Sequence, residues 1–157
     1  MTQTDSSDTI EFDLKGLEQL IKALKGQVPY GRIGVLGKKT NRQGETTNAQ
    51  VGAAHEFGTT RLPQRSFLRI PLIEHLNKYL EKSGAFTDAT MKKVIREGSL
   101  KPWMQLVMIT AELVVADAFR TGGFGKWRRS NMAKKRVKQT LIETQQLRNS
   151  ISSEVKT

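Results

Sequence analysis

The adjacent residues His55 and Glu56 are the pair in this chain best suited to acid–base chemistry. Nucleophilic catalysis would also need a serine or threonine placed against the histidine, and no GxSxG or comparable turn is present. A metal site needs three or four converging ligands, yet the chain has no cysteine and only one further histidine, His75. We therefore expect no catalytic residue, no metal and no cofactor, and a hydrolase using His55 is the weaker alternative. His55 is expected to satisfy polar groups of a tight turn, and His75 to be a solvated surface residue.

The glycine-rich segment TGGFGKW, residues 121–127, invites a phosphate-binding interpretation. It contains neither GxxxxGK[ST] nor a GxGxxG placed between a strand and a helix, so the spacing does not fit either phosphate-binding mechanism. The other glycine cluster, YGRIGVLG at residues 30–37, has its glycines in a strand-like pattern. We expect no nucleotide site.

Positive charge is concentrated near the C-terminal end, where no acid occurs between Asp117 and Glu143. A tryptophan among basic residues can stack on a base while the cations meet phosphates. This gives an alternative hypothesis, a basic nucleic-acid-binding protein that uses residues 120–138. The candidate DNA or partner contacts are Lys126, Trp127, Arg128, Arg129, Lys134 and Lys135. In the competing interpretation, Trp127 and Phe124 anchor a loop to the domain and the flanking charges are solvated.

The segments HEFGT (55–59) and LPQRSFLR (62–69) lie almost directly against each other. Proline and glycine fix the backbone there, so we expect a rigid recognition loop. Phe57 and Phe67 are predicted to be its buried anchors, and its arginines are predicted to reach outward and pair with carboxylates. The predicted assembly interface consists of His55, Glu56, Phe57, Arg61, Arg65, Phe67 and Arg69.

Length and composition indicate that the candidate residues described above belong to a single domain. The chain has 157 residues, 37% of them hydrophobic, and a net charge of +11. Its first 14 residues hold Asp5, Asp8, Glu11 and Asp13 but no lysine or arginine. We expect residues 1–12 to be a disordered or assembly-ordered arm and residues 13–157 to form the domain. The N-terminal residues do not resemble a signal peptide, and the apolar run 103–119 includes charged residues, so we expect a soluble cytoplasmic product with no membrane partner.

Local signals predict a sequence of short elements. A helix capped by Asp13 and ended by Gly26 should precede a strand over residues 30–37, with Ile33 and Val35 on one side. After a polar loop, a helix capped by Asn48 should end at Gly58, and an irregular loop should cover residues 59–65.

Three further helices are expected. The first has Pro71 in its first turn and an apolar stripe of Leu72, Ile73, Leu76, Tyr79 and Leu80. A polar helix should cover residues 87–97. The longest helix, capped by Ser99 and running to residue 120, is apolar almost all round and is expected to be the central buried one. A basic helix at 130–138, a turn at 144–150 and a strand from Ile151 should follow. The predicted fold class is α+β, with a small antiparallel sheet packed against helices and one long central helix.

Three blocks of the sequence together resemble the neck and tail-completion proteins of tailed bacteriophages, also called virion-morphogenesis or minor tail proteins. The first is IGVLG (33–37) followed by VGAAHEFGT (51–59), and the second is LPQRSFLR (62–69). The third comprises Trp127, then Lys134 and Lys135, then LIETQQLRNSI (141–151).

The resemblance implies a non-enzymatic virion protein that acts in tail completion and head–tail joining. Such proteins form rings, usually sixfold, so the implied partners are further copies of the chain, tail-tube proteins and head-connector proteins, with DNA passing through the channel. The implied location is the tail or neck of the virion, and the host cytoplasm during assembly. The acidic N-terminal segment and the basic C-terminal region are unlike surfaces, which a ring-forming interface requires.

Overall fold

The computed structural model describes residues 18–19, 21–22, 25–26, 28–36, 47–128 and 145–157. Within these residues the elements, in chain order, are β1 (Tyr30–Val35), α2 (Asn48–Phe57), α3 (Arg69–Lys82), α4 (Asp88–Glu97), α5 (Lys101–Thr121), α6 (Gln145–Asn149) and β2 (Ile151–Lys156). The α+β class, with its small antiparallel sheet and one long helix, is confirmed. The predicted arm at 1–12, the polar loop at 38–46 and the basic helix at 130–138 lie outside the described residues, as does most of the predicted first helix.

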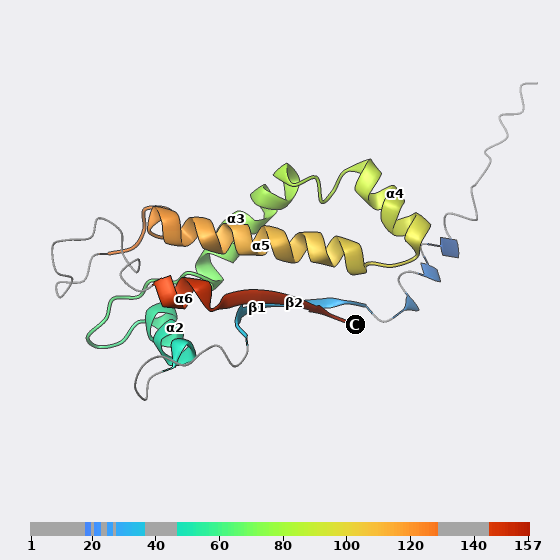
Figure 1. Ribbon diagram of the computed structural model, residues 1–157. Coiled ribbons are helices and arrows are strands. Elements are labelled where there is room, and N and C mark those ends of the chain that lie inside the picture. The colour runs from blue at the N-terminus through green and yellow to red at the C-terminus, as the bar shows by residue number, and fades with distance from the viewer. Residues whose placement is uncertain (1–17, 20, 23–24, 27, 37–46, 129–144) are drawn as a thin grey trace, which may run out of the picture.

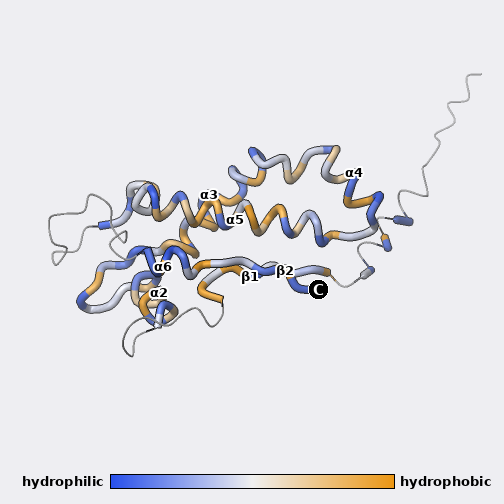
Figure 2. The backbone as a smooth tube through the Cα atoms, viewed as in Figure 1, coloured by the Kyte–Doolittle hydropathy of each residue, from blue (hydrophilic) through white to orange (hydrophobic). Residues whose placement is uncertain are grey.

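The long helix α5 runs between α3 on one side and the sheet on the other (Figure 1). Its buried residues include Val114, Val115, Ala118 and Phe119, and apolar colouring recurs along its length in Figure 2. The helix is not buried all round, however, because Ile109 and Leu113 are 57% and 55% exposed. By length and composition alone α5 could cross a bilayer, a test that the core helix of a soluble protein also passes.

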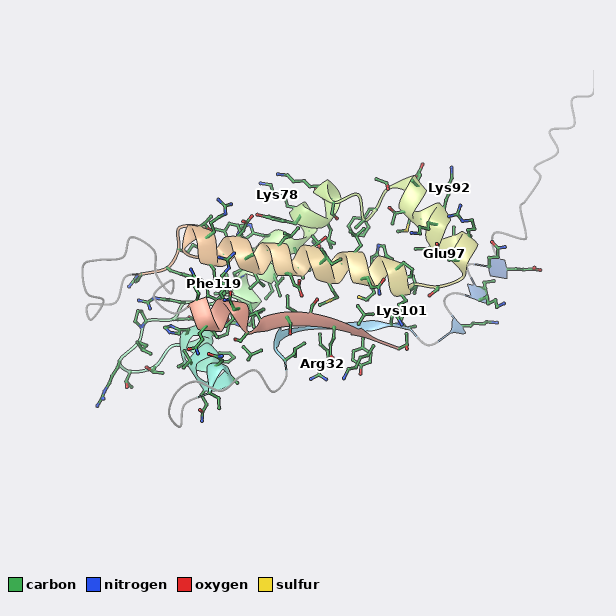
Figure 3. The ribbon with its side chains drawn as sticks, viewed as in Figure 1. Arg32, Lys78, Lys92, Glu97, Lys101 and Phe119 are labelled. Carbon is green, nitrogen blue, oxygen red and sulfur yellow. The ribbon has the colours of Figure 1, made fainter. Side chains whose placement is uncertain are left out.

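The sheet pairs β1 with β2 in antiparallel register, from Tyr30 opposite Lys156 to Val35 opposite Ile151. Ile33 and Val35 pack on the core, as the alternation of the sequence predicted. Arg32 lies on the other face, where its side chain forms an ion pair of 3.4 Å with Glu154 (Figure 3). A two-stranded sheet is marginal in water, so the packing of α5 across it supplies the stability it lacks.

Two contacts fasten α5 to the sheet. A Cβ atom at Gly31 would lie 2.0 Å from the Met108 sulfur, so the missing side chain lets β1 approach the helix closely. On the neighbouring strand, the Ser153 N–H donates to Glu112 Oε1 of α5 at 2.7 Å. This bond occupies a backbone donor of β2 that the sheet itself leaves unpaired.

Two helix starts differ from the sequence-based expectation. Thr47, not Asn48, caps α2: its hydroxyl accepts from the Gln50 N–H at 3.2 Å, and the Gln50 side chain accepts from the Thr47 N–H at 2.8 Å. This reciprocal pair is a capping box, whose spacing of three residues is present in the sequence. Leu100, not Ser99, precedes α5, although the Ser99 hydroxyl still accepts from the Lys101 N–H.

The predicted apolar stripe of α3 packs inward except at one residue, since Leu72, Leu76, Tyr79 and Leu80 are buried or half-buried. Ile73 is 73% exposed although it lies two turns from buried Leu80. The chain folds back over the Leu80 end, where the Ala85 N–H donates to the Leu80 carbonyl, and leaves Ile73 uncovered. His75 was expected to be solvated, but its ring lies against Phe124 with ring centres 3.8 Å apart, and it is therefore part of the packing.

Candidate assembly site

The carboxylate of Glu56 organises the predicted recognition loop from inside. Glu56 is 6% exposed. Its Oε1 accepts from the Ser66 hydroxyl at 2.5 Å and from the Arg69 N–H at 3.0 Å. Its Oε2 accepts from the N–H groups of Phe67 and Leu68 at 2.9 and 3.0 Å. These donors stand at the start of α3, where a helix leaves its N–H groups without internal partners and favours negative charge.

Glu56 therefore acts as a cap for α3, supplied by the end of another helix. This position corrects the prediction that Glu56 belongs to the intermolecular interface. Its carboxylate is buried and already receives four hydrogen bonds, so a partner protein has no access to it.

The rest of the loop is held by shorter-range bonds. The Thr59 hydroxyl accepts from the Leu62 N–H at 3.0 Å, and the Thr59 N–H donates to the Leu62 carbonyl at 2.9 Å. The Arg65 N–H donates to the His55 carbonyl at 2.7 Å, and the Gln64 side chain donates to the Glu56 carbonyl at 3.1 Å. The His55 carbonyl therefore accepts from one backbone donor of the turn.

Phe67 is the centre of the core at this end of the molecule. It is 1% exposed and lies 5.1 Å, ring centre to ring centre, from Phe119. Phe119 is labelled near the end of α5 in Figure 3. Leu147 of α6 belongs to the same buried cluster. Trp127 meets Phe119 edge-on at 5.7 Å and donates from Nε1 to the Ser66 carbonyl at 3.0 Å. Three segments far apart in the sequence therefore meet around one side chain, and the prediction that Phe67 is a buried anchor is confirmed.

The outward side of the loop carries Phe57, Arg61 and Arg69. Phe57 was predicted to be buried, but as the last residue of α2 it faces solvent and is 68% exposed. Both arginines are exposed, as expected. Among the seven predicted interface residues, these three side chains are the exposed ones. The segment that carries them is held on its inner side by the hydrogen bonds to Glu56.

Arg65 is placed differently from the other two arginines. It is 4% exposed, and its Nε donates to the Arg128 carbonyl at 3.0 Å. Its Nη2 is buried and has no hydrogen-bond acceptor, and burial lowers the pKa of the guanidinium. The prediction that Arg65 reaches outward is wrong, because the loop turns this side chain beneath residue 128.

The glycine-rich turn after α5 uses its own backbone donors. The N–H groups of residues 123–127 donate to Ala118, Thr121, Gly122 and Gly123, at distances from 2.7 to 3.1 Å. A phosphate-binding loop instead directs several N–H groups at the ligand. In this turn those donors close the end of α5.

Most basic side chains near this turn have partners within the domain. Lys126 forms an ion pair of 2.5 Å with Glu74, and Arg120 pairs with Asp117 at 3.0 Å. The Trp127 ring contacts Phe119, which supports the anchoring interpretation over a base-stacking one. Arg128 is exposed and forms no ion pair with a described residue. Arg129, Lys134 and Lys135 lie outside the described residues.

A hydrogen-bonded group that the sequence did not reveal joins α3 to α5. The Tyr79 hydroxyl donates to Asp117 Oδ2 at 2.5 Å, and the Arg120 Nε donates to Oδ1 at 3.0 Å. The bond from Tyr79, followed by that from Arg120, lowers the pKa of Asp117. The same bond raises the pKa of Tyr79. Because these residues stand 38 positions apart, no local spacing could have identified them.

A cleft of about 180 Å³ lies between the loop and the glycine-rich turn. Glu74 and Lys126 stand at this cleft but neutralise each other. Across the described residues, no three histidine, aspartate or glutamate side chains are grouped as a metal site would require. The chemistry of this end is therefore that of a rigid surface with outward-facing arginines and an aromatic ring.

Comparison with known proteins identifies no relative. No protein-family model matches the chain, and neither the curated proteins nor the solved structures contain a significant match. Function is therefore inferred from the residues and their arrangement.

Proposed function

We propose that this chain is a structural virion protein of a tailed bacteriophage, acting in tail completion and head–tail joining without catalysis. The observation that carries the proposal is the convergence of the three resembling blocks around Phe67. Glu56 of the first block binds the backbone of the second, while Trp127 and Leu147 of the third pack on the same core. Such convergence is expected if the resemblance reflects a common architecture and not isolated short matches.

In this proposal the loop is one half of a subunit interface. A ring closes when one surface of each copy meets a different surface of the next. Phe57, Arg61 and Arg69 supply an aromatic contact and two planar cations, which are residue types favoured at interface centres. The partners are further copies, six in a ring by the resemblance, together with tail-tube and head-connector proteins. The protein acts in the tail or neck of the virion and assembles in the host cytoplasm.

Sedimentation and negative-stain imaging test this role. We expect the purified chain to form rings, alone or with tail-tube protein. The variant Arg61→Glu/Arg69→Glu should abolish them, because it reverses two exposed charges of the loop. The matched control is Lys78→Glu/Lys92→Glu, which reverses two charges on α3 and α4 that point outward in Figure 3. A chain that remains monomeric even with tail-tube protein contradicts the proposal, and equal effects of the two variants contradict the placement of the interface.

The alternative function is nucleic-acid binding through residues 120–138, favoured by the absence of any acid between Asp117 and Glu143. Nonspecific DNA binding requires only clustered positive charge and weakens steeply with salt. A salt-dependent DNA affinity that disappears when Arg128, Arg129, Lys134 and Lys135 are neutralised would favour this alternative. The internal contacts of Trp127 and Lys126 count against base stacking and remove one phosphate contact from the described part of the segment.

A further inference from the structure

One face of α5 carries an apolar stripe that no described part of the chain covers. Ile109 and Leu113 stand one turn apart on this face and are 57% and 55% exposed. Gln105, one turn earlier, and Arg120, two turns later, are exposed on the same face. The other side of the helix packs against α3 and the sheet. Large aliphatic side chains that adjoin one another on a surface are typical of an association site.

The charges that border the stripe limit what can cover it. Arg120 lies at its end, and the exposed Arg148 lines a cleft of about 220 Å³ together with Ala116 of α5. The loop of a neighbouring copy is therefore a poor occupant, because it would bring Arg61 and Arg69 against two further cations. A bilayer could enclose α5 only after the buried side of the helix had left the domain. A protein surface that is apolar at its centre, with its cations held away from these arginines, fits the stripe better.

The stripe is complementary to itself. A two-fold axis that passes midway between Ile109 and Leu113 sets two α5 helices antiparallel, and each Ile109 then meets Leu113 of the other copy. Three positions further out on either side, the large Leu106 meets the small Ala116, and both are half-buried in the single chain. Residues 105, 109 and 113 form one ridge of side chains spaced by four, which is the kind of ridge that packs most often between helices.

The same symmetry places opposite charges together. Pro102 and Arg120 stand equally far from the midpoint on opposite sides of it, so they lie at one level in the antiparallel pair. Pro102 shares a cleft of about 200 Å³ with Glu97, which is labelled near the start of α5 in Figure 3. The ion pair that Glu97 forms within its own chain is long, at 3.9 Å. Arg120 of one copy is therefore brought near Glu97 of the other, whereas a parallel pair would set Arg120 against Arg120.

We propose that the exposed face of α5 binds the same face of a second copy, antiparallel, with Ile109 against Leu113. This inference goes beyond the proposed function and does not rest on it, because a two-fold contact joins like surfaces whereas a ring joins unlike ones. Both contacts can exist in one assembly, and each can be lost without the other.

Sedimentation equilibrium measures the α5 contact alone when the full chain carries the charge reversal of the two loop arginines, which removes the proposed ring contact. In that parent chain we expect a dimer. Adding Ile109→Glu/Leu113→Glu should raise the dissociation constant of the dimer by about a hundredfold or more, since it charges the centre of the interface. The matched control is Val28→Glu/Ile73→Glu, which changes two apolar residues that are 61% and 73% exposed elsewhere on the molecule. It should leave the dissociation constant unchanged.

Cysteine cross-linking tests the orientation of the pair, because the chain has no cysteine of its own. Two parent chains of different mass, one with Ile109→Cys and the other with Leu113→Cys, are mixed and oxidised. Antiparallel pairing should give the disulfide-linked heterodimer in several-fold excess over both homodimers, because it sets these two positions face to face. Parallel pairing would favour the homodimers. A control mixture of Ile73→Cys with Leu113→Cys should remain unlinked.

The inference is overturned if the parent chain remains monomeric at about 100 μM, if its dimer tolerates Ile109→Glu/Leu113→Glu, or if the homodimers predominate after oxidation. Circular dichroism should show that the glutamate variant folds like its parent, because both side chains lie at the surface. Should that variant unfold, the cysteine mixture decides, and the lack of excess heterodimer overturns the inference. A monomer whose Ile109 and Leu113 are needed to bind phosphatidylcholine vesicles would assign this face to a membrane and overturn it equally.

Failure of this inference is distinguishable from failure of the assembly role. If wild-type chains form rings while the parent chain with the reversed loop arginines forms no dimer, only the α5 contact is refuted. If that dimer forms through α5 but wild-type chains neither form rings nor join tail-tube protein, the α5 contact stands and the virion role fails.

Discussion

The two ends of α5 are stabilised in different ways. At the end near residue 121, an irregular loop is held by a buried carboxylate with four donors and packs through Phe67, which is 1% exposed. At the end near residue 101, α4 packs beside α5 and leaves Phe86 56% exposed. The turn before α4 is held by local bonds from the Thr87 and Thr90 hydroxyls to the Gly84 carbonyl, and a bond of 3.0 Å from Trp103 Nε1 to the Ala85 carbonyl joins it to α5.

The difference shows that regular secondary structure is a poor guide to where this molecule is rigid. Rigidity follows from buried polar groups whose partners are supplied across the fold, since breaking any one of them leaves another unsatisfied. The loop meets that condition more fully than the α4 region does. Changes in the loop should therefore unfold the domain, while changes near α4 should act locally.

The largest effect is expected from Glu56→Ala. It leaves four donors at the start of α3 without their acceptor, which should cost about 3 to 5 kcal/mol of unfolding free energy. The control is Glu97→Ala, which removes a surface ion pair with Lys93 and should cost less than about 0.5 kcal/mol. Urea unfolding monitored by circular dichroism measures both. Similar losses from the two variants would show that the loop end is no more dependent on buried bonds than the surface of α4.

A smaller loss is expected from Gly123→Ala, at about 2 to 3 kcal/mol. The residue has a φ of 66°, and a Cβ atom there would lie 2.2 Å from Trp127 Nε1, so the indole must leave the Ser66 carbonyl. Gly122→Ala has a nearly equal φ of 68° with nothing within 4 Å of the added carbon. It should lose only about 1 kcal/mol.

Thermal unfolding and tryptophan emission measure the difference between the two glycine variants. Only Gly123→Ala should alter the emission of Trp127. If the two variants behave alike, backbone conformation alone matters and the indole contact contributes nothing.

Tyr79→Phe, in the middle of the molecule, should cost about 1.5 kcal/mol at neutral pH because it removes a bond to a carboxylate. The pKa of Asp117 is lowered from its ordinary value of 3.8. The ionised carboxylate therefore stabilises the folded state above that pH, and this stabilisation is lost as the pH falls through the lowered pKa. The pKa of Tyr79 is raised from 10.0. The protonated hydroxyl therefore stabilises the folded state below that pH, and this stabilisation is lost as the pH rises through the raised pKa.

The stability difference between the wild type and Tyr79→Phe should therefore be greatest from about pH 5 to pH 9 and smaller on either side. Denaturant titrations over this range provide the measurement. A difference that stays constant from pH 2 to pH 11 would contradict a role for the Tyr79–Asp117 bond.

The smallest global effect is expected from Trp103→Phe. It removes the bond to the Ala85 carbonyl but keeps an aromatic ring beside Phe86, so overall stability should fall by about 1 kcal/mol or less. Hydrogen exchange should accelerate in α4 and not in α2 or the loop, because the opening is local. Faster exchange throughout the chain would show that the two ends unfold as one unit and that the contrast between them is false.

The sequence predicted the elements well because their signals are local. Gly58 ends α2, the polar helix predicted at residues 87–97 is α4, and the alternation after Ile151 forms β2. The sequence also predicted Phe67 as a buried anchor, because an aromatic ring between a proline-containing loop and a helix is expected to pack against the domain. These inferences depend on neighbours within a few positions.

The sequence could not predict which polar groups would meet across the fold. Glu56 and Arg65 both stand in a polar segment and were expected at an interface, yet one became an internal cap and the other a buried cation. The burial and bonding of these two side chains depend on how α2 packs against the start of α3, and no local spacing of residues predicts that packing. Likewise, the apolar character of Ile109 and Leu113 did not reveal that no described neighbour covers them.

The pairing of β1 with β2 has a consequence for protein synthesis. Val35 emerges from the ribosome long before Ile151, its partner in the sheet. Chains are elongated at about 5 to 20 residues per second, so β1 stays without its strand partner for several seconds or more. A nascent chain can fold helices during that interval, but the sheet cannot close until residues 151–156 have been synthesised. Stalled or truncated translation products would therefore carry an open strand and depend on chaperones to stay unaggregated.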